Sequence, residues 1–342
     1  MDVQALKAKI KSGDIGGWYI FSGEEDYLKK YYLSLLRQSA VDDGPFAPFN
    51  HSVYDGDDVD MAAIEEDIKS PPMMGDYKFI EWKFADLDGQ KESVKKALLE
   101  LCELKADYPT SIFAIMTTAD GFDIGTPKRP SKLAGKLSSG FEIINFAKST
   151  DNQLLAWLKK HFDAEGITVD MASLNALLFR AGRSMEILNN EVEKLSAYLK
   201  ANGKSALSVA EVELIASPTV ECDAFALSNA VIEKDSARAL IALTDLKQRR
   251  VEPQTVLAML ERTYADLASV ALLLEEGCGV SDVESIMKFH PYKAKLYIGA
   301  AKKIGRKKLS EGLSELCRLD AGSKSGGSSG YGTIEMFVAK HL

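Results

Sequence analysis

Short apolar runs alternate with amphipathic helical segments over the first 147 residues, and this alternation stops at Lys148. Runs rich in aromatic and β-branched residues predict strands, because such side chains pack well on a pleated surface. Segments with helical spacing of apolar residues lie between most of these runs. Strands joined through helices favour a parallel sheet with helices on both faces. The predicted strands cover residues 17–21, 50–54, 77–84, 112–116 and 141–146, and the predicted helices between them cover residues 26–36, 60–68 and 91–102.

After residue 148 the chain carries helical signals only. Amphipathic helices are expected over residues 170–180 and 184–199, where apolar residues recur every three or four positions. Two capping boxes are expected, one formed by Thr150 with Gln153 and one by Ser208 with Glu211. This part of the chain is therefore predicted to form a compact domain of three or four helices.

From Cys222 onward the pattern is again helical. Asp223 is expected to cap one helix, and Pro253 suits the first turn of a long helix that ends at Gly277. Residues 322–332, rich in Gly and Ser, predict a flexible loop before a last helix. The sequence thus predicts three domains, at residues 1–147, 148–217 and 218–342.

The first predicted strand runs into a loop where a P-loop ATPase would place G-x-x-x-x-G-K-[ST]. That motif binds phosphates through glycine backbone N–H groups and a lysine. Here residues 22–26 read Ser-Gly-Glu-Glu-Asp, with one glycine and three consecutive carboxylates. Repulsion between a phosphate charge and each carboxylate costs about 1 kcal/mol at roughly 4 Å in water. ATP binding is therefore not expected, and the acidic residues suit the positive end of the helix that follows.

The sequence also contains no motif typical of a catalytic or metal site. The 4 cysteines and 4 histidines are scattered, with no C-x-x-C and no H-E-x-x-H, so no metal is expected. No Ser-His-Asp, Cys-His or paired-carboxylate pattern predicts a catalytic residue. No apolar run reaches the roughly 18 residues that a membrane span needs, and the first residues lack the apolar core of a signal peptide. A cytoplasmic protein without membrane contact is expected.

The segment Pro71-Pro72-Met73-Met74-Gly75 is the most distinctive local motif. Prolines fix the direction of the chain, and the motif therefore places the two methionines on a turn. From the residues alone, two interpretations stay open. The methionines either fill the core of the first domain or project from it to bind a partner.

A basic segment lies between Ser285 and Ser310, within a chain whose net charge is −8. Such a segment can attract DNA phosphates, or it can be the solvated face of a helix, and both interpretations stay open. It contains no acidic residue and eight basic ones: Lys288, Lys293, Lys295, Lys302, Lys303, Arg306, Lys307 and Lys308.

Three stretches, spread over nearly the whole chain, match the pattern of one family. WYIFSGEEDYLKKYY at residues 18–32 matches a strand followed by G-E-E-x-x-L, and LNNEVEKLSAY at residues 188–198 matches L-x-N-E-L-E-K-L-x-x-Y. Residues 224–230, 290–292 and 320–324 match its third-domain pattern. Together they resemble the delta subunit of the bacterial DNA polymerase III clamp loader. Residues 326–330, Gly-Gly-Ser-Ser-Gly, are more flexible than the usual tail of the family.

The resemblance implies an α/β N-terminal AAA+-like domain with a parallel sheet and without ATP binding, followed by two all-α domains: a lid and a collar domain for oligomerisation. It implies a non-catalytic subunit that binds and opens the sliding clamp during DNA replication. This subunit is a component of the DNA polymerase III holoenzyme, a DNA-directed DNA polymerase and nucleotidyltransferase. The absence of the Ser-Arg-Cys motif of the sister subunits favours delta.

The resemblance also implies sites and partners. By this resemblance, Met73 and Met74 are the pair of apolar side chains, here called the wedge, that enters a hydrophobic pocket of the clamp. The expected partners are the sliding clamp, the other clamp-loader subunits of a hetero-pentamer, and primed DNA through the assembled complex, and no cofactor is expected. Two other functions stay open, an active AAA+-type ATPase and a helical adaptor outside replication. The candidate DNA-binding residues are Lys302, Lys303, Arg306, Lys307 and Lys324.

Overall fold

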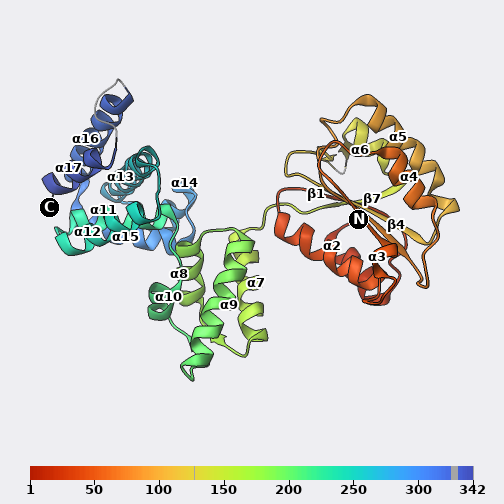
Figure 1. Ribbon diagram of the computed structural model, residues 1–342. Coiled ribbons are helices and arrows are strands. Elements are labelled where there is room, and N and C mark those ends of the chain that lie inside the picture. Colours follow the sequence, from red (N-terminus) through yellow and green to blue (C-terminus); the bar gives the residue numbers. More distant parts are fainter. Residues whose placement is uncertain (127, 325–329, 342) are drawn as a thin grey trace. The chain divides into compact units, whose positions relative to one another are not determined.

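The computed structural model describes residues 1–126, 128–324 and 330–341 of the chain (Figure 1). The chain forms two compact units, Met1–Ser149 and Thr150–Leu342. The first predicted domain boundary, after residue 147, lies two residues before the division between these units. The second predicted boundary, after residue 217, falls inside the second unit and stays a prediction.

A five-stranded parallel sheet with the order β2-β3-β4-β1-β7 forms the centre of the first unit. Each of its strands lies within one residue of a predicted strand. A short antiparallel pair, β5 (Gly125–Thr126) and β6 (Arg129–Pro130), was not predicted. The strands of the sheet are β1 (Trp18–Ser22), β2 (His51–Asp55), β3 (Lys78–Ala85), β4 (Ser111–Thr117) and β7 (Phe141–Asn145).

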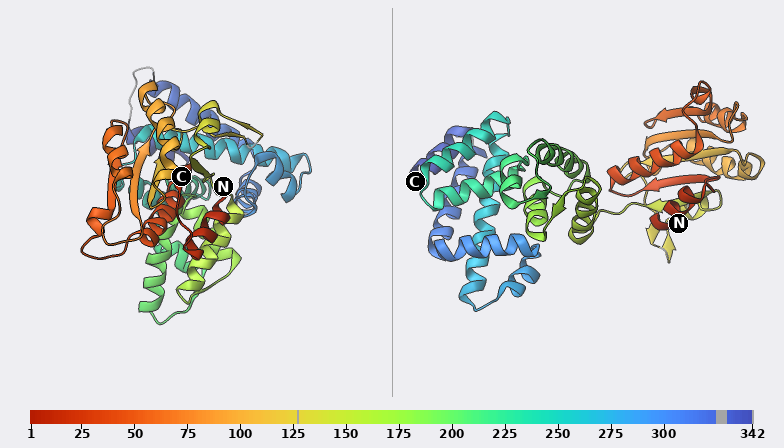
Figure 2. Two further views of the ribbon diagram at one scale, coloured as in Figure 1. Left: turned by 90° about the vertical axis from the view of Figure 1, so that its right-hand side faces the viewer. Right: turned by 90° about the horizontal axis from the view of Figure 1, so that it is seen from below.

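The sheet separates two apolar cores, one on each face. Along β1, Trp18 and Ile20 belong to the core that α4, α5 and α6 complete, while Tyr19 and Phe21 belong to the core beneath α1 and α2. A strand buried on both faces has no polar alternate positions, which explains its continuous apolar sequence. Figure 2 shows the sheet between its helices from two further sides. The helices of this unit are α1 (Val3–Ser12), α2 (Asp26–Ala40), α3 (Ala47–Asn50), α4 (Met61–Lys69), α5 (Glu92–Leu104), a 3-10 turn (Lys105–Asp107) and α6 (Lys132–Leu137).

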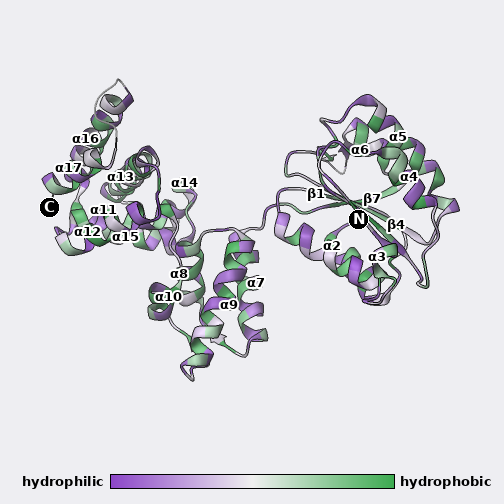
Figure 3. Ribbon diagram, in the orientation of Figure 1, coloured by the Kyte–Doolittle hydropathy of each residue, from purple (hydrophilic) through white to green (hydrophobic). Residues whose placement is uncertain are grey.

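The second unit begins with four helices whose apolar stripes pack together (Figure 3). Both predicted capping boxes are present, at the starts of α7 and α10. The expectation of helices alone is wrong in one detail. Residues of β8 and β9 form a parallel pair of two residues each, because the loops before α8 and before α10 run side by side. These elements are α7 (Asp151–Ala164), β8 (Thr168–Val169), α8 (Met171–Ala181), α9 (Met185–Ala201), β9 (Ala206–Leu207) and α10 (Val209–Ile215).

Seven further helices share one apolar core that includes Phe225, Tyr264 and Phe337. The predicted cap at Asp223 is wrong, because Thr219 caps the helix and Asp223 lies inside its first turn, paired with Arg249 at 3.0 Å. The helices are α11 (Val220–Ile232), α12 (Ser236–Gln248), α13 (Pro253–Glu275), α14 (Val280–Met287), α15 (Pro291–Ile304), α16 (Arg306–Lys324) and α17 (Tyr331–His341).

The predicted loop at residues 322–332 is only partly an interruption between helices. Residues 322–324 continue α16, and Tyr331 begins α17. Residues 325–329 of this predicted loop, and with them most of the glycine-rich tail, lie outside the described residues.

Candidate functional sites

The loop between β1 and α2 lies at the carboxyl edge of the sheet, where open parallel sheets commonly bind ligands. Only three residues separate β1 from α2. Gly23 has φ +104°, and a Cβ at this position would lie 2.5 Å from the carbonyl oxygen of Phe146. The same oxygen accepts the N–H of Glu25 at 3.0 Å, and Phe146 donates its own N–H to the Ser22 carbonyl at 2.7 Å. The loop is closed against the residue that follows β7, and one N–H that could face a phosphate is already bonded.

Lys29, on the first turn of α2, is fully buried at the same edge of the sheet. Its Nζ donates to the carbonyl oxygen of Thr117 at 2.7 Å and pairs with Asp26 Oδ1 at 2.8 Å. A buried ammonium group is stable only with such partners. Burial also raises the pKa of the Glu25 carboxyl above its usual value. The ammonium group of Lys29 is thus bound to the end of strand β4 and does not face the loop.

The turn that joins α4 to β3 carries Met73 and Met74, and it exposes both side chains. Met73 is 45% exposed and Met74 is 83% exposed. The interpretation in which the two methionines fill the core is therefore wrong. Met74 also has φ +53°, a left-handed conformation that costs a residue with a Cβ about 1–2 kcal/mol.

Asn50, the last residue of α3, holds this turn in place. Its Oδ1 accepts the N–H of Met73 at 2.6 Å, and its Nδ2 donates to the Met73 carbonyl oxygen at 2.8 Å. The Asn50 side chain is buried. This role of Asn50 was not predicted, because 23 positions separate Asn50 from Met73 and no local pattern links them.

Two phenylalanines beside Asn50 add to the exposed apolar surface. Phe46, which precedes α3, is 40% exposed, and Phe49 within α3 is 60% exposed. Because Asn50 bonds directly to Met73, α3 and the methionine turn form one connected structure. The first unit therefore presents exposed apolar side chains on two adjoining segments.

Four of the candidate DNA-binding residues lie close together along the chain, at the junction of α15 and α16. Lys303 pairs with Glu233 at 2.9 Å and Arg306 with Glu275 at 3.2 Å. Lys302 and Lys307 are exposed, and within the described part of the chain neither is paired with a carboxylate. The structure thus supplies two free and two neutralised charges here.

Lys324 does not join the other four candidates. It lies 18 residues beyond Arg306 on the same helix, which at 1.5 Å per residue is about 27 Å away. Its Nζ pairs with Asp320 at 2.5 Å. Any contact of Lys324 with DNA would therefore be separate from contacts at the α15–α16 junction.

The described residues contain neither a cluster of metal-ligating side chains nor a helix suited to span a membrane. Over residues 1–126, 128–324 and 330–341, no three His, Cys, Asp or Glu side chains gather as a metal site would require. Among the described helices, none is both long and apolar enough to cross a membrane.

Two family models match the chain. The model of the DNA polymerase III delta subunit matches residues 19–127, and the model of the C-terminal domain of the same subunit matches residues 221–341. The chain belongs to the DNA polymerase III delta subunit family. Membership of this family makes the chain a component of DNA polymerase III.

Comparison with individual proteins agrees with the family. DNA polymerase III subunit delta of Bacillus subtilis (strain 168) is 22% identical over 339 residues, which cover 97% of this chain and 95% of the relative. The structure of the Bacillus subtilis DNA clamp loader delta protein (YqeN) has a TM-score of 0.58 and 20% identity, with 99% of each chain covered. At this identity the structural comparison shows the fold alone. It confirms the predicted order of an α/β domain with a parallel sheet followed by helical structure.

Proposed function

We propose that this delta-family chain binds the sliding clamp through Met73 and Met74 and helps to open the clamp ring, without hydrolysing ATP itself. In this proposal the first domain grips the clamp, residues 148–217 act as a lid, and residues 218–342 join the collar of a hetero-pentamer in the cytoplasm. Lys302, Lys303, Arg306, Lys307 and Lys324 are the proposed contacts with primed DNA in the assembled loader.

The observation that carries the proposal is the exposure of Met74 on a turn that the protein holds rigidly. An apolar side chain that is 83% exposed contributes little to its own core, so its contact with water is a cost that a partner can remove. Full burial of two methionine side chains is worth roughly 3–6 kcal/mol before the cost of association. Methionine also adapts well to the shape of a pocket.

The absence of ATP hydrolysis is supported by the β1–α2 loop. Three residues are too few to wrap a phosphate as the P-loop does, and Glu24 and Glu25 would repel it. Gly23 cannot relax the loop, because it already lies against the Phe146 carbonyl group. The rival function, an active ATPase, would need this loop to rebuild itself around a nucleotide.

Clamp binding can be tested by a double variant, Met73→Ala with Met74→Ala, in a surface-immobilised clamp assay. Truncating an anchor residue of an interface costs on the order of 2–4 kcal/mol, so the double variant should bind more than about a hundredfold more weakly. The melting temperature should hardly change, because both side chains are exposed. Met336→Ala is the matched control, since Met336 is an exposed methionine of the second unit.

Two results would contradict the proposal. Unchanged clamp affinity of the double variant would place the contact elsewhere. No measurable binding of the wild-type chain to the clamp would instead favour an adaptor function outside clamp loading.

A further inference from the structure

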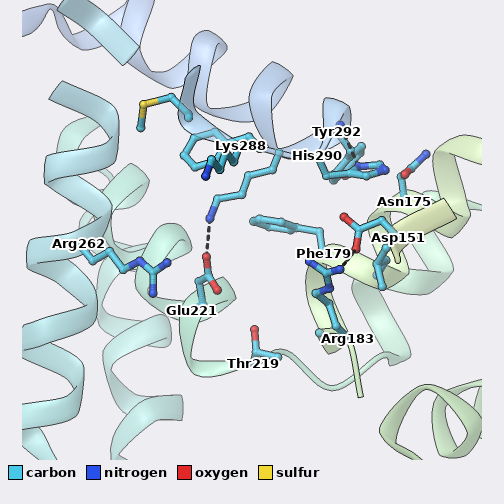
Figure 4. Close-up of a pocket in the computed structure, with 15 residues that line it drawn as sticks. Asp151, Asn175, Phe179, Arg183, Thr219, Glu221, Arg262, Lys288, His290 and Tyr292 are labelled. Carbon is cyan, nitrogen blue, oxygen red and sulfur yellow. Dashed lines mark hydrogen bonds and ion pairs between the residues drawn. The ribbon is translucent and has the colours of Figure 1, made fainter. Parts of the chain in front are cut away.

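The second unit contains a cavity of about 550 Å³ that the proposed function does not use (Figure 4). Its wall is built from α8 and the link that follows it, the first residues of α7, α11 and α15, one residue of α13, and the last residue of α14 with the segment between α14 and α15. A volume of this size is typical of sites for small organic molecules. The chemistry of its lining indicates which class of molecule fits.

Four cationic side chains line the cavity, and two of them are already neutralised there. Arg183 pairs with Asp151 at 2.9 Å, and Lys293 pairs with Glu221 at 2.5 Å. Figure 4 shows both pairs as dashed lines. They contribute no net charge to a bound molecule.

Arg262 and Lys288 are the remaining two cations of the lining. In the described part of the chain, neither makes an ion pair. The Asp266 carboxyl, one turn further along α13, is close enough to Arg262 for an electrostatic interaction, but Asp266 does not line the cavity. Arg262 comes from the middle of α13, whereas Lys288 caps α14 with φ +53°. The cavity therefore carries a net charge of about +2 from two side chains that approach from different helices.

His290 adds a hydrogen-bond donor. Its Nδ1 accepts the N–H of Tyr292 at 3.3 Å, where His290 caps α15. In a neutral ring with Nδ1 as acceptor, the proton is on Nε2. The starts of α11 and α15 also meet at this cavity, and the partial positive charges of helix N-termini favour an anion.

An aromatic surface lines another part of the cavity. The rings of Phe179 and Tyr292 have their centroids 5.9 Å apart, at an angle of 58°. Phe179 lies on α8 and also contacts Phe225 of the apolar core. A flat ring can stack on such side chains, as bases do on the aromatic residues of nucleic-acid-binding proteins.

We propose that this cavity binds a nucleoside monophosphate, with the phosphate between Arg262 and Lys288 and the base against Phe179 and Tyr292. The charge of the cavity favours a phosphate monoester. Such a group carries about −1.5 to −2 at neutral pH, and the unpaired Arg262 and Lys288 together carry +2. The guanidinium group supplies two parallel donors to phosphate oxygens, and the lysine adds a point charge. This site is separate from the methionine turn and from the β1–α2 loop.

The proposal can be tested by isothermal titration calorimetry on the full chain without Mg²⁺, using AMP, GMP, CMP and UMP separately. At least one should bind, and its nucleoside without phosphate should bind about tenfold more weakly or worse. Arg262→Gln and Lys288→Gln should each weaken binding by about tenfold or more, as expected for loss of a hydrogen bond to a charged group. Lys295→Gln is the matched control, because Lys295 is an exposed lysine of α15 that does not line the cavity.

Three results would overturn the proposal. The first is no binding of any of the four monophosphates at millimolar concentration. The second is unchanged affinity in both cavity variants, which would place the ligand elsewhere. The third is equally tight binding of inorganic phosphate, which would remove the role of Phe179 and Tyr292. Arg262→Gln should keep its affinity for the clamp, so failure here and failure of the proposed clamp contact are distinguishable.

Discussion

Replacing Asn50 by alanine should weaken clamp binding, although the buried Asn50 side chain is not itself part of the proposed clamp contact. The variant removes both hydrogen bonds that hold Met73, at 2.6 and 2.8 Å. Each such bond has a net worth of about 0.5–1.5 kcal/mol. The turn also keeps Met74 at φ +53°, a conformation that is unfavourable by about 1–2 kcal/mol and needs outside support.

The expected size of the effect follows from the fraction of molecules whose methionine turn has the conformation that binds the clamp. Losing about 2 kcal/mol of support lowers that population at most about 30-fold, and the apparent dissociation constant rises by the same factor. Some of the loss is absorbed if water bonds to the freed Met73 groups, so an increase of about tenfold is expected. The association rate constant should fall, and the dissociation rate constant should change little, because fewer molecules have the turn in the conformation that binds.

The assay is clamp binding with resolved association and dissociation rates, together with the melting temperature. Asn202→Ala is the matched control, since the Asn202 amide also donates to a backbone carbonyl, that of Tyr198 at 2.8 Å, but lies in the second unit. Asn50→Asp should fall between wild type and Asn50→Ala, because the carboxylate can still accept the Met73 N–H. If Asn50→Ala binds as tightly as wild type while the methionine variant does not bind, the positioning argument is refuted.

Two further predictions concern ATP and the separate first unit. Millimolar Mg-ATP should not raise the melting temperature of a chain carrying Arg262→Gln and Lys288→Gln, in which only the β1–α2 loop is tested; a rise of several degrees would show by mass action that this loop binds nucleotide. A fragment of residues 1–149 should bind the clamp but fail to enter the assembled loader, as measured by co-elution; a fragment that co-elutes with the loader would contradict the role given to the helical unit. A cut after residue 217 is less suitable for this test, because it would expose the Phe179 ring that packs on Phe225.

Local signals in the sequence were sufficient for most of the fold. The apolar runs that became β1 and β4 are buried at every position, and the two capping boxes depend on residues only three positions apart. The cap at Asp223 was wrong because Thr219, four positions earlier, satisfies the same helix end. A carboxylate near a helix start has more than one suitable position, and the local sequence does not decide between them.

The contacts that shape the candidate sites are long-range, and the sequence alone could not supply them. The amphipathic pattern of α2 gives no sign that Lys29 is buried, because its partner is a backbone carbonyl 88 positions away. The cavity next to Arg262 is assembled from six helices and the segments that link them. By contrast, Met73 and Met74 could be singled out in advance, because prolines and glycine mark a turn whatever its surroundings.

The conformation of Met74 argues that its side chain is kept for a purpose other than folding. At φ +53° a glycine would avoid the steric cost that a Cβ causes, and an 83% exposed thioether adds little to the core. The next residue, Gly75, is closely packed against the same asparagine, since a Cβ there would lie 3.1 Å from the Asn50 amide nitrogen. Stability alone therefore favours neither the residue nor its exposure. A turn that is strained, apolar and yet fixed by a buried asparagine is what a preorganised contact with a partner requires, because the ordering cost is met before the partner arrives.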